Sequence, residues 1–168
     1  MTGLYIHVPF CRSKCNYCDF YSVRPDDGVA ESYIQAILKA AELYQNEKID
    51  TVYFGGGNPL LLGAQNLCKL YNGLSGVFAL EKDREITLEA NPEDITPEAA
   101  KILFDGGFNR ISVGVQSLDD EVLKKLGRRH DAKQAKAAIE TAFKAGFGHI
   151  SADLMLSLPD ATPEKDRE

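Results

Sequence analysis

Apolar and polar residues follow two different spacings along this chain of 168 residues. Short apolar runs, typical of buried strands, are separated by longer segments in which apolar residues recur every three or four positions, as in amphipathic helices. The expected strands are residues 4–8, 49–54, 85–90, 110–114 and 149–155. The expected helices are residues 29–45, 63–74, 96–107, 119–126 and 131–146, and a further helix opens at Thr162.

This repeated order of strand and helix predicts an α/β fold, with a parallel sheet and helices outside it. A barrel and an open doubly wound sheet both fit the pattern. No low-complexity stretch or linker divides the sequence, and its length is sufficient for one core. We therefore expect residues 1–168 to form one domain.

Composition narrows the class of protein. Apolar residues make up 44% and charged residues 26% of the chain, as in ordinary globular proteins. The net charge of −6 argues against a nucleic-acid partner, which would favour a basic surface. No apolar run approaches the ~20 residues of a membrane span, and the N-terminus lacks signal-peptide features. We expect a cytoplasmic protein whose four cysteines serve as metal ligands or redox groups.

Three of these cysteines, Cys11, Cys15 and Cys18, follow the first strand in a C-x3-C-x2-C spacing. Iron–sulfur clusters are normally held by four thiolates, so three would leave one iron open to a small molecule. A structural zinc is the alternative, with His7 or His130 as the fourth ligand. Cys68 stands alone in a helical pattern and is expected to be a small buried hydrophobe.

Polar and glycine residues gather where the expected strands end. Parallel strands bring their carboxyl ends to one edge, where ligands bind in barrels and open sheets alike. Together they indicate a cavity for a polar, zwitterionic, ribose-bearing ligand. The alternative for each residue alone is a tight turn or a solvated rim. The residues are the glycines at 55–57, Glu89, Gln116, Arg128 and Asp153.

The stretch Tyr5-x-His-Val-Pro-Phe-Cys-x3-Cys-x-Tyr-Cys resembles the radical S-adenosylmethionine (SAM) superfamily, and within it the oxygen-independent coproporphyrinogen III oxidases. Further motifs of that family follow in the same order over essentially the whole chain. They are Gly-Gly-Gly-x-Pro at 55–59, Glu-x-Asn-Pro at 89–92, Arg-Ile-Ser-x-Gly-x-Gln-Ser at 110–117, Leu-Gly-Arg-x-His at 126–130, and Asp-Leu-Met at 153–155.

The resemblance implies a parallel (β/α) partial TIM-type barrel of the radical SAM type, truncated after the fifth strand, and thus an incomplete radical SAM core. It implies that Cys11, Cys15 and Cys18 bind three irons of a 4Fe-4S cluster and that SAM chelates the fourth iron through its amino and carboxylate groups. Reduction of the cluster would split SAM into methionine and a 5′-deoxyadenosyl radical. The residues implied to contact SAM are Tyr5, Gly56, Gly57, Asn58, Glu89, Gln116, Arg128 and Asp153.

The chain departs from the family pattern in three ways. Phe20 stands where the oxidases have a fourth cysteine, and Asn58 stands where the family usually has threonine. Family members are also more than twice as long. The Asp-Phe ending at residues 19–20 is similar to the haem chaperone branch of the family.

We therefore expect a haem chaperone that passes haem to an acceptor haemoprotein and needs an electron donor. The first alternative is an oxidase that acts on coproporphyrinogen III in haem synthesis. The second alternative is a zinc-stabilised α/β binding module. The histidines do not identify a haem site, and the sequence leaves open whether the protein is an enzyme. The fifth strand should leave an exposed sheet edge, so we expect the chain to dimerise or aggregate.

Overall fold

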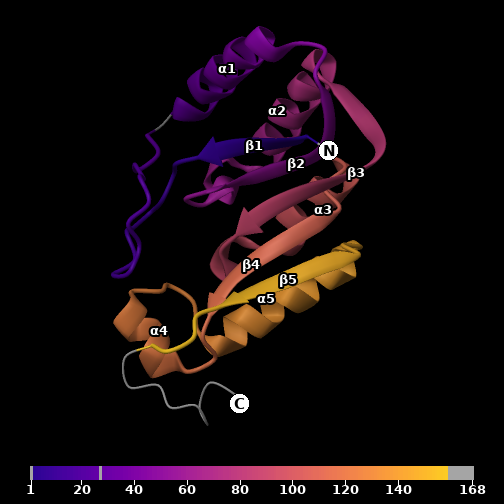
Figure 1. Cartoon of the computed structure of the whole chain (residues 1–168). Coiled ribbons are helices and arrows are strands. Elements are labelled where there is room, and N and C mark those ends of the chain that lie inside the picture. The colour runs from indigo at the N-terminus through magenta and orange to yellow at the C-terminus, as the bar shows by residue number, and fades with distance from the viewer. Residues whose placement is uncertain (1, 27, 159–168) are drawn as a thin grey trace.

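The computed structural model describes residues 2–26 and 28–158. Its five strands form one parallel sheet in the order β1-β2-β3-β4-β5 (Figure 1). Each strand therefore pairs with its neighbour in sequence, as in a barrel. In a doubly wound sheet, by contrast, the order of the strands across the sheet reverses at a switch point. This confirms the predicted partial barrel. The strands are β1 (Gly3–Val8), β2 (Lys48–Gly56), β3 (Ala79–Ala90), β4 (Arg110–Gln116) and β5 (His149–Leu154).

Helices pack on the outer face of the sheet, and α4 lies at the end where the strands finish (Figure 1). Side-chain caps fix several helix starts: Asp131 and Gln134 form a capping box, and Thr96 accepts a hydrogen bond from the backbone of Ala99. The helices are α1 (Val29–Ala41), α2 (Ala64–Val77), α3 (Pro97–Asp105), α4 (Asp120–Leu126) and α5 (Ala132–Ala145), with 3-10 turns η1 (Glu42–Tyr44), η2 (Pro59–Leu62) and η3 (Pro92–Asp94).

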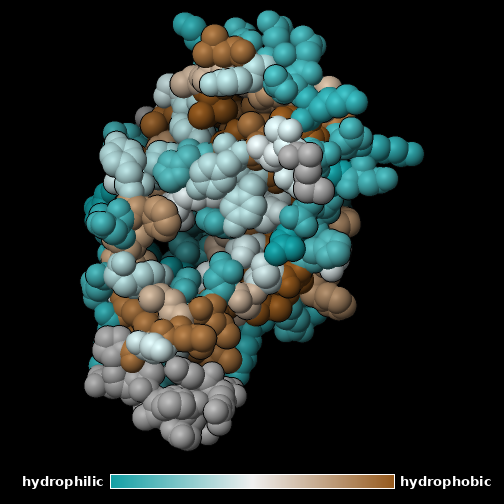
Figure 2. Space-filling view, viewed as in Figure 1, coloured by the Kyte–Doolittle hydropathy of each residue, from teal (hydrophilic) through white to brown (hydrophobic). Residues whose placement is uncertain are grey.

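The two faces of the sheet differ in chemistry because side chains alternate along each strand. Phe54, Leu88 and Ile111 are buried under the helices. The neighbouring positions, such as Glu89 and Ser112, point to the opposite, inner face. The space-filling view over this side of the sheet is mainly hydrophilic (Figure 2). The outer face therefore holds the core, and the inner face is left for polar contacts.

Several predicted boundaries were wrong. β3 begins at Ala79 instead of residue 85, because the charged segment at residues 81–84 hides a strand that shifts register against β2 between Ile49 and Thr51. α2 continues to Val77, and α1 gives way to a 3-10 turn after Ala41. The helix expected at Thr162 lies outside the described residues.

Cys68 was expected to be buried and is only half-buried. It packs beside the core, and its thiol lies 3.6 Å from the carbonyl oxygen of Ile102. The reason is its place on α2, at the margin of the contact with α3.

β5 is the last strand of the described sheet and pairs there only with β4. Its residues Ala152 and Leu154 are exposed. Across residues 2–26 and 28–158, none of the helices combines the length and apolar character needed to cross a membrane.

Candidate cofactor site

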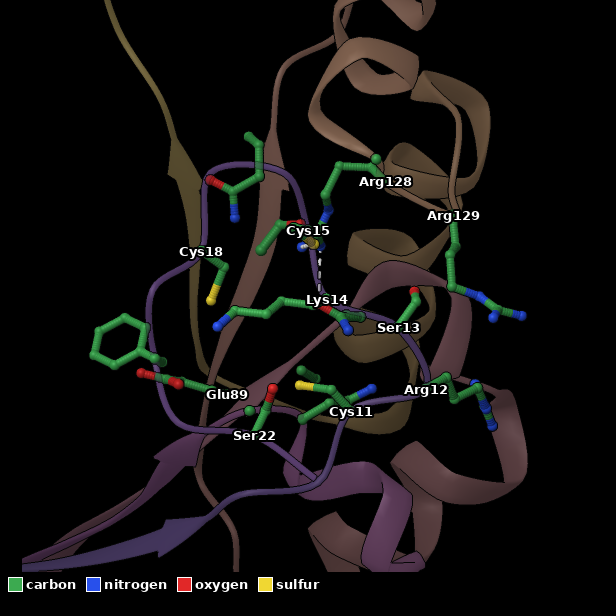
Figure 3. Close-up of a pocket in the computed structure, with 18 of the residues that line it drawn as sticks. Cys11, Arg12, Ser13, Lys14, Cys15, Cys18, Ser22, Glu89, Arg128 and Arg129 are labelled. Carbon is green, nitrogen blue, oxygen red and sulfur yellow. Dashed lines mark hydrogen bonds between the residues drawn. The ribbon is translucent and has the colours of Figure 1, made fainter. Parts of the chain in front are cut away.

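A cavity of about 230 Å³ lies at the carboxyl edge of the sheet (Figure 3). One wall is the cysteine loop, residues 9–23. The other wall, called here the strand edge, comprises residues 56–58, Glu89, Gln116, Arg128 and Asp153. The cavity brings together every residue predicted to bind the cluster or SAM except Tyr5. Those that line it are Cys11, Cys15, Cys18, Gly56, Gly57, Asn58, Glu89, Gln116, Arg128 and Asp153.

Tyr5 lies beside this cavity, on the inner face of β1. It is 54% exposed and stacks on Tyr53 with ring centroids 5.9 Å apart. The hydroxyl of Tyr53 in turn donates to Glu89. Tyr5 is therefore connected to the strand edge indirectly, through its ring contact with Tyr53.

Backbone hydrogen bonds hold the base of the cysteine loop. The N–H of Cys11 donates to the carbonyl of Val23, and the N–H of Val23 donates to Pro9. The N–H groups of Gly57 and Asn58 donate to Val8 and Phe10, which ties the β2 turn to the same base. The glycine turn and the first cysteine are therefore fixed relative to each other.

The tip of the cysteine loop rests on α4. Asn16 donates its backbone N–H to Leu126 and its side-chain amide to the carbonyl of Lys125. Arg128, just beyond α4, places one guanidinium nitrogen 3.7 Å from the sulfur of Cys15. A fixed positive charge beside the loop suits thiolate ligands.

The three thiols are free and surround the cavity, with Glu89 facing them (Figure 3). Burial raises the pKa of the Cys11 thiol, although the neighbouring Ser22 opposes this. Within the described residues, no three Cys, His, Asp or Glu side chains converge closely enough for a single metal ion. A cluster would spread the three thiolates over separate irons.

The two histidines considered as a fourth zinc ligand have other contacts. His130 is buried and bonded to the carbonyl of Val115. His7 lies on β1 with its Nδ1 atom 3.1 Å from the Tyr5 hydroxyl. Neither residue lines the cavity, which disfavours a Cys3His zinc site.

Close approach explains the glycine turn. Gly56 has φ of 120°, and a Cβ there would lie 2.6 Å from the ring of His7. A Cβ on Gly57 would lie 2.6 Å from the carbonyl oxygen of Phe10 and 2.8 Å from the sulfur of Cys11. Only glycine lets this backbone pass so near the cysteine loop.

The carboxylates of the strand edge are already oriented by neighbours. Glu89 accepts hydrogen bonds from the Tyr53 hydroxyl at 2.6 Å and from the Gly56 N–H at 3.1 Å. Burial and this contact with Glu89 raise the pKa of Tyr53, which keeps its hydroxyl a donor. Asp153 accepts from Ser112 at 3.0 Å on both oxygens.

Gln116 and Arg128 complete the edge. Gln116 has φ of 68°, a left-handed conformation that is uncommon outside glycine, where β4 shifts register against β5. Arg128 donates to the Asn91 side chain at 2.8 Å and to the Gly114 carbonyl at 2.6 Å. The left-handed backbone of Gln116 is strained, and such strain is often found at functional sites.

Three supporting residues, Tyr53, Asn91 and Ser112, were missed by sequence reasoning. Tyr53 and Ser112 share the inner face with Glu89, so the alternation of side chains along the strands was the available signal, and Ser112 also stood within the quoted motif at 110–117. Asn91 stood within the quoted Glu-x-Asn-Pro motif but received no role.

Unpaired polar atoms indicate that the cavity suits a polar ligand. Asn58 is buried and donates to Asp94, yet its side-chain oxygen has no hydrogen-bond partner among the described residues. The Nε atom of Arg128 is likewise buried and unpaired there. A buried polar atom without a partner costs about 1–3 kcal/mol, which a bound polar group could recover. The donor set, three thiols with carboxylate, amide and guanidinium, fits a cluster and SAM.

A parallel half-barrel with three thiols and a glycine turn at its carboxyl edge defines a cofactor-binding α/β protein with an iron–sulfur type of donor set. The model of the Radical SAM superfamily matches residues 5–168, and the chain belongs to that superfamily.

Two curated relatives and one solved structure narrow the similarity. The chain is 41% identical to the heme chaperone HemW of Lactococcus lactis, over 95% of this chain and 42% of that protein. It is 38% identical to HemW of Bacillus subtilis, over 96% and 44%. The structure of coproporphyrinogen III oxidase (HemN) from Escherichia coli, a radical SAM enzyme, superposes with a TM-score of 0.87 at 30% identity, over 98% and 39%. The chain thus spans less than half the length of the relatives it matches.

Proposed function

We propose that Cys11, Cys15 and Cys18 bind three irons of a 4Fe-4S cluster and leave the fourth iron open to SAM. One observation carries this proposal: a single cavity joins three free thiols to a glycine turn and two oriented carboxylates. These are the groups needed for a cluster and for a ligand that carries an amino acid and a ribose.

The strand edge would hold SAM through groups of both charges. The backbone of Gly56 and Gly57 allows close approach, and the unpaired oxygen of Asn58 offers an acceptor. The carboxylates of Glu89 and Asp153 suit hydroxyl or ammonium groups, while Gln116 and Arg128 suit carboxylate or ring atoms. When bound, the cluster supplies the electron for reductive cleavage of SAM; the protein orients the ligand and excludes water.

We propose further that the protein containing this radical SAM core is a haem chaperone. The relatives of Lactococcus lactis and Bacillus subtilis are named as heme chaperones. Phe20 supports this, because the oxidase pattern places a fourth cysteine there and Phe20 lines the cavity instead. The partners would be haem, a haem-accepting protein and an electron donor, and the compartment would be the cytoplasm.

Two measurements test this function. Anaerobic reconstitution should give a brown protein with about four irons and four sulfides per chain, and one tightly held zinc without sulfide would contradict it. Haem added to the protein should give a bound spectrum and should pass to an apo-haemoprotein. Coproporphyrinogen III incubated with SAM and reductant should remain unchanged.

The second candidate is a coproporphyrinogen III oxidase, favoured by the structural similarity to HemN. Loss of coproporphyrinogen in that last assay would select it over the chaperone.

We also propose self-association of this chain. β5 exposes Ala152 and Leu154, and Leu156 just beyond it is 69% exposed. Exposed apolar strands promote association. Sedimentation should show a dimer or larger species, and a stable monomer would contradict this.

A further inference from the structure

His130 is a fully buried imidazole that the proposed function does not use. None of its side-chain surface is exposed, and it does not line the cavity. It lies in the segment between α4 and α5, two residues after Arg128. A polar ring in such a position needs partners, and they connect it to the cofactor site.

Both ring nitrogens face defined groups. Nε2 lies 3.0 Å from the carbonyl oxygen of Val115, and since a carbonyl only accepts, Nε2 donates. Nδ1 lies 3.5 Å from Oε2 of Glu93, and neither of these atoms has a hydrogen-bond partner among the described residues. The imidazole therefore spans from the end of β4 to η3.

The contact with Val115 bears on Gln116, the next residue. Gln116 has φ of 68° at the point where β4 and β5 shift register. Such a conformation is strained and persists only where the surroundings hold it. The bond from His130 to Val115 restrains the backbone just before Gln116, and the bond from Met155 N–H to the Gln116 carbonyl restrains it just after.

Arg128 acts on the preceding residue of the same strand. It donates to the carbonyl of Gly114 at 2.6 Å, while His130 donates to the carbonyl of Val115. One short segment thus binds two consecutive carbonyls of β4. The orientation of Arg128 and the backbone of Gln116 are therefore fixed together.

We propose that His130, seated against Glu93, is a positioning residue that holds Gln116 and Arg128 in the arrangement that binds SAM. The inference rests on the proposed function for the identity of the ligand. His130 itself touches neither ligand nor cluster and acts through the β4 backbone.

Two substitutions separate the two contacts of the ring. The amide nitrogen of glutamine can reach the position of Nε2 and donate to Val115, whereas the shorter asparagine reaches only the position of Nδ1. His130→Asn should therefore weaken SAM binding about 10-fold, on the order of one lost hydrogen bond. His130→Gln should restore affinity to within about 3-fold of the unchanged protein. His149→Asn, at an exposed histidine that opens β5, is the matched control and should change nothing.

SAM affinity is measured by equilibrium dialysis on the anaerobically reconstituted protein, beside iron and sulfide content and the urea midpoint. A general loss of structure would lower cluster content and midpoint together. The proposed role lowers SAM affinity while cluster content stays constant.

Unchanged affinity in His130→Asn would overturn the inference, and so would equal weakening by His130→Gln. Should His130→Asn not fold, Glu93→Gln, which alters the seat of the ring, should weaken SAM binding about 3-fold. Unchanged affinity in that variant would overturn the inference as well. Failure of the unchanged protein to bind SAM is a different result, because it contradicts the proposed function itself.

Discussion

The two walls of the cavity reach their positions by different means. The cysteine loop contains no helix or strand, only an isolated bridge between Phe10 and Val23. Backbone bonds fix its base and tip, and its three cysteine side chains are free thiols. On the strand edge, Glu89 and Arg128 each have at least two hydrogen bonds within the protein, and the Ser112 hydroxyl lies within hydrogen-bond distance of both oxygens of Asp153.

This difference separates what the fold supplies from what a cofactor supplies. The strand edge is preorganised by neighbouring side chains, so it can present its groups to a ligand with little ordering cost. A thiol makes only weak hydrogen bonds, so the cluster itself would complete the order of the cysteine loop. Variants of the loop should therefore affect the cluster, and variants of the edge should affect SAM.

The largest effect is expected from Cys15→Ser. A serine oxygen is a poor substitute for a thiolate on iron, so reconstitution should lose most of the bound iron and sulfide. The urea midpoint of the cluster-free chain should change little, because Cys15 is only partly buried on the loop. Cys68→Ser, far from the cavity on α2, is the control and should keep its cluster. A Cys15→Ser protein with full iron content would show that the ligand set is wrong.

The next effect is expected at the junction of the two walls. Gly57→Ala would place a Cβ within 2.6 Å of the Phe10 carbonyl oxygen, so the turn and the loop must move apart. We expect a loss of about 1–3 kcal/mol in unfolding free energy, together with lower cluster content. Gly76→Ala is the matched control: it lies in α2 with no atom within 4 Å, and should gain about 0.5–1 kcal/mol. Equal urea curves for the two variants would refute the close approach.

The two walls of the cavity could be predicted from the sequence to different extents. The fold followed from strand and helix periods, and most of the strand edge followed because Glu89 and Asp153 end strands. Strand order was not determined, since both windings share the same pattern. The supports of the edge, such as Ser112 beneath Asp153, depend on cross-strand register, which a sequence pattern does not state. The start of β3 was also missed, because residues 81–84 are charged and only the pairing with β2 shows that the strand begins before them.

A smaller effect is expected from Asp153→Asn on the strand edge. The amide keeps one acceptor for Ser112 but loses the charge that a ligand hydroxyl or ammonium would meet. A charge-assisted hydrogen bond contributes roughly 1.5–3 kcal/mol, so SAM binding should weaken at least about 10-fold. Cluster content should not change. Glu98→Gln, exposed in the first turn of α3, is the control. Loss of the cluster in Asp153→Asn would mean that the two walls are not separable.

The smallest expected effect is a loss of stability at low pH through Glu93. Burial would raise the pKa of Glu93, but His130 beside it and the charge of Arg128 outweigh burial and hold the pKa below its ordinary 4.5. The ionised carboxylate therefore stabilises the fold above pH 4.5, and this stabilisation is lost as the pH falls through the folded pKa. Urea unfolding at pH 6 and pH 3 should show the unchanged protein losing more stability than Glu93→Gln. If the two proteins lose the same unfolding free energy between pH 6 and pH 3, the charge of Glu93 does not support the strand edge. The contrast with the cysteine loop then rests on the hydrogen bonds of Glu89, Asp153 and Arg128 alone.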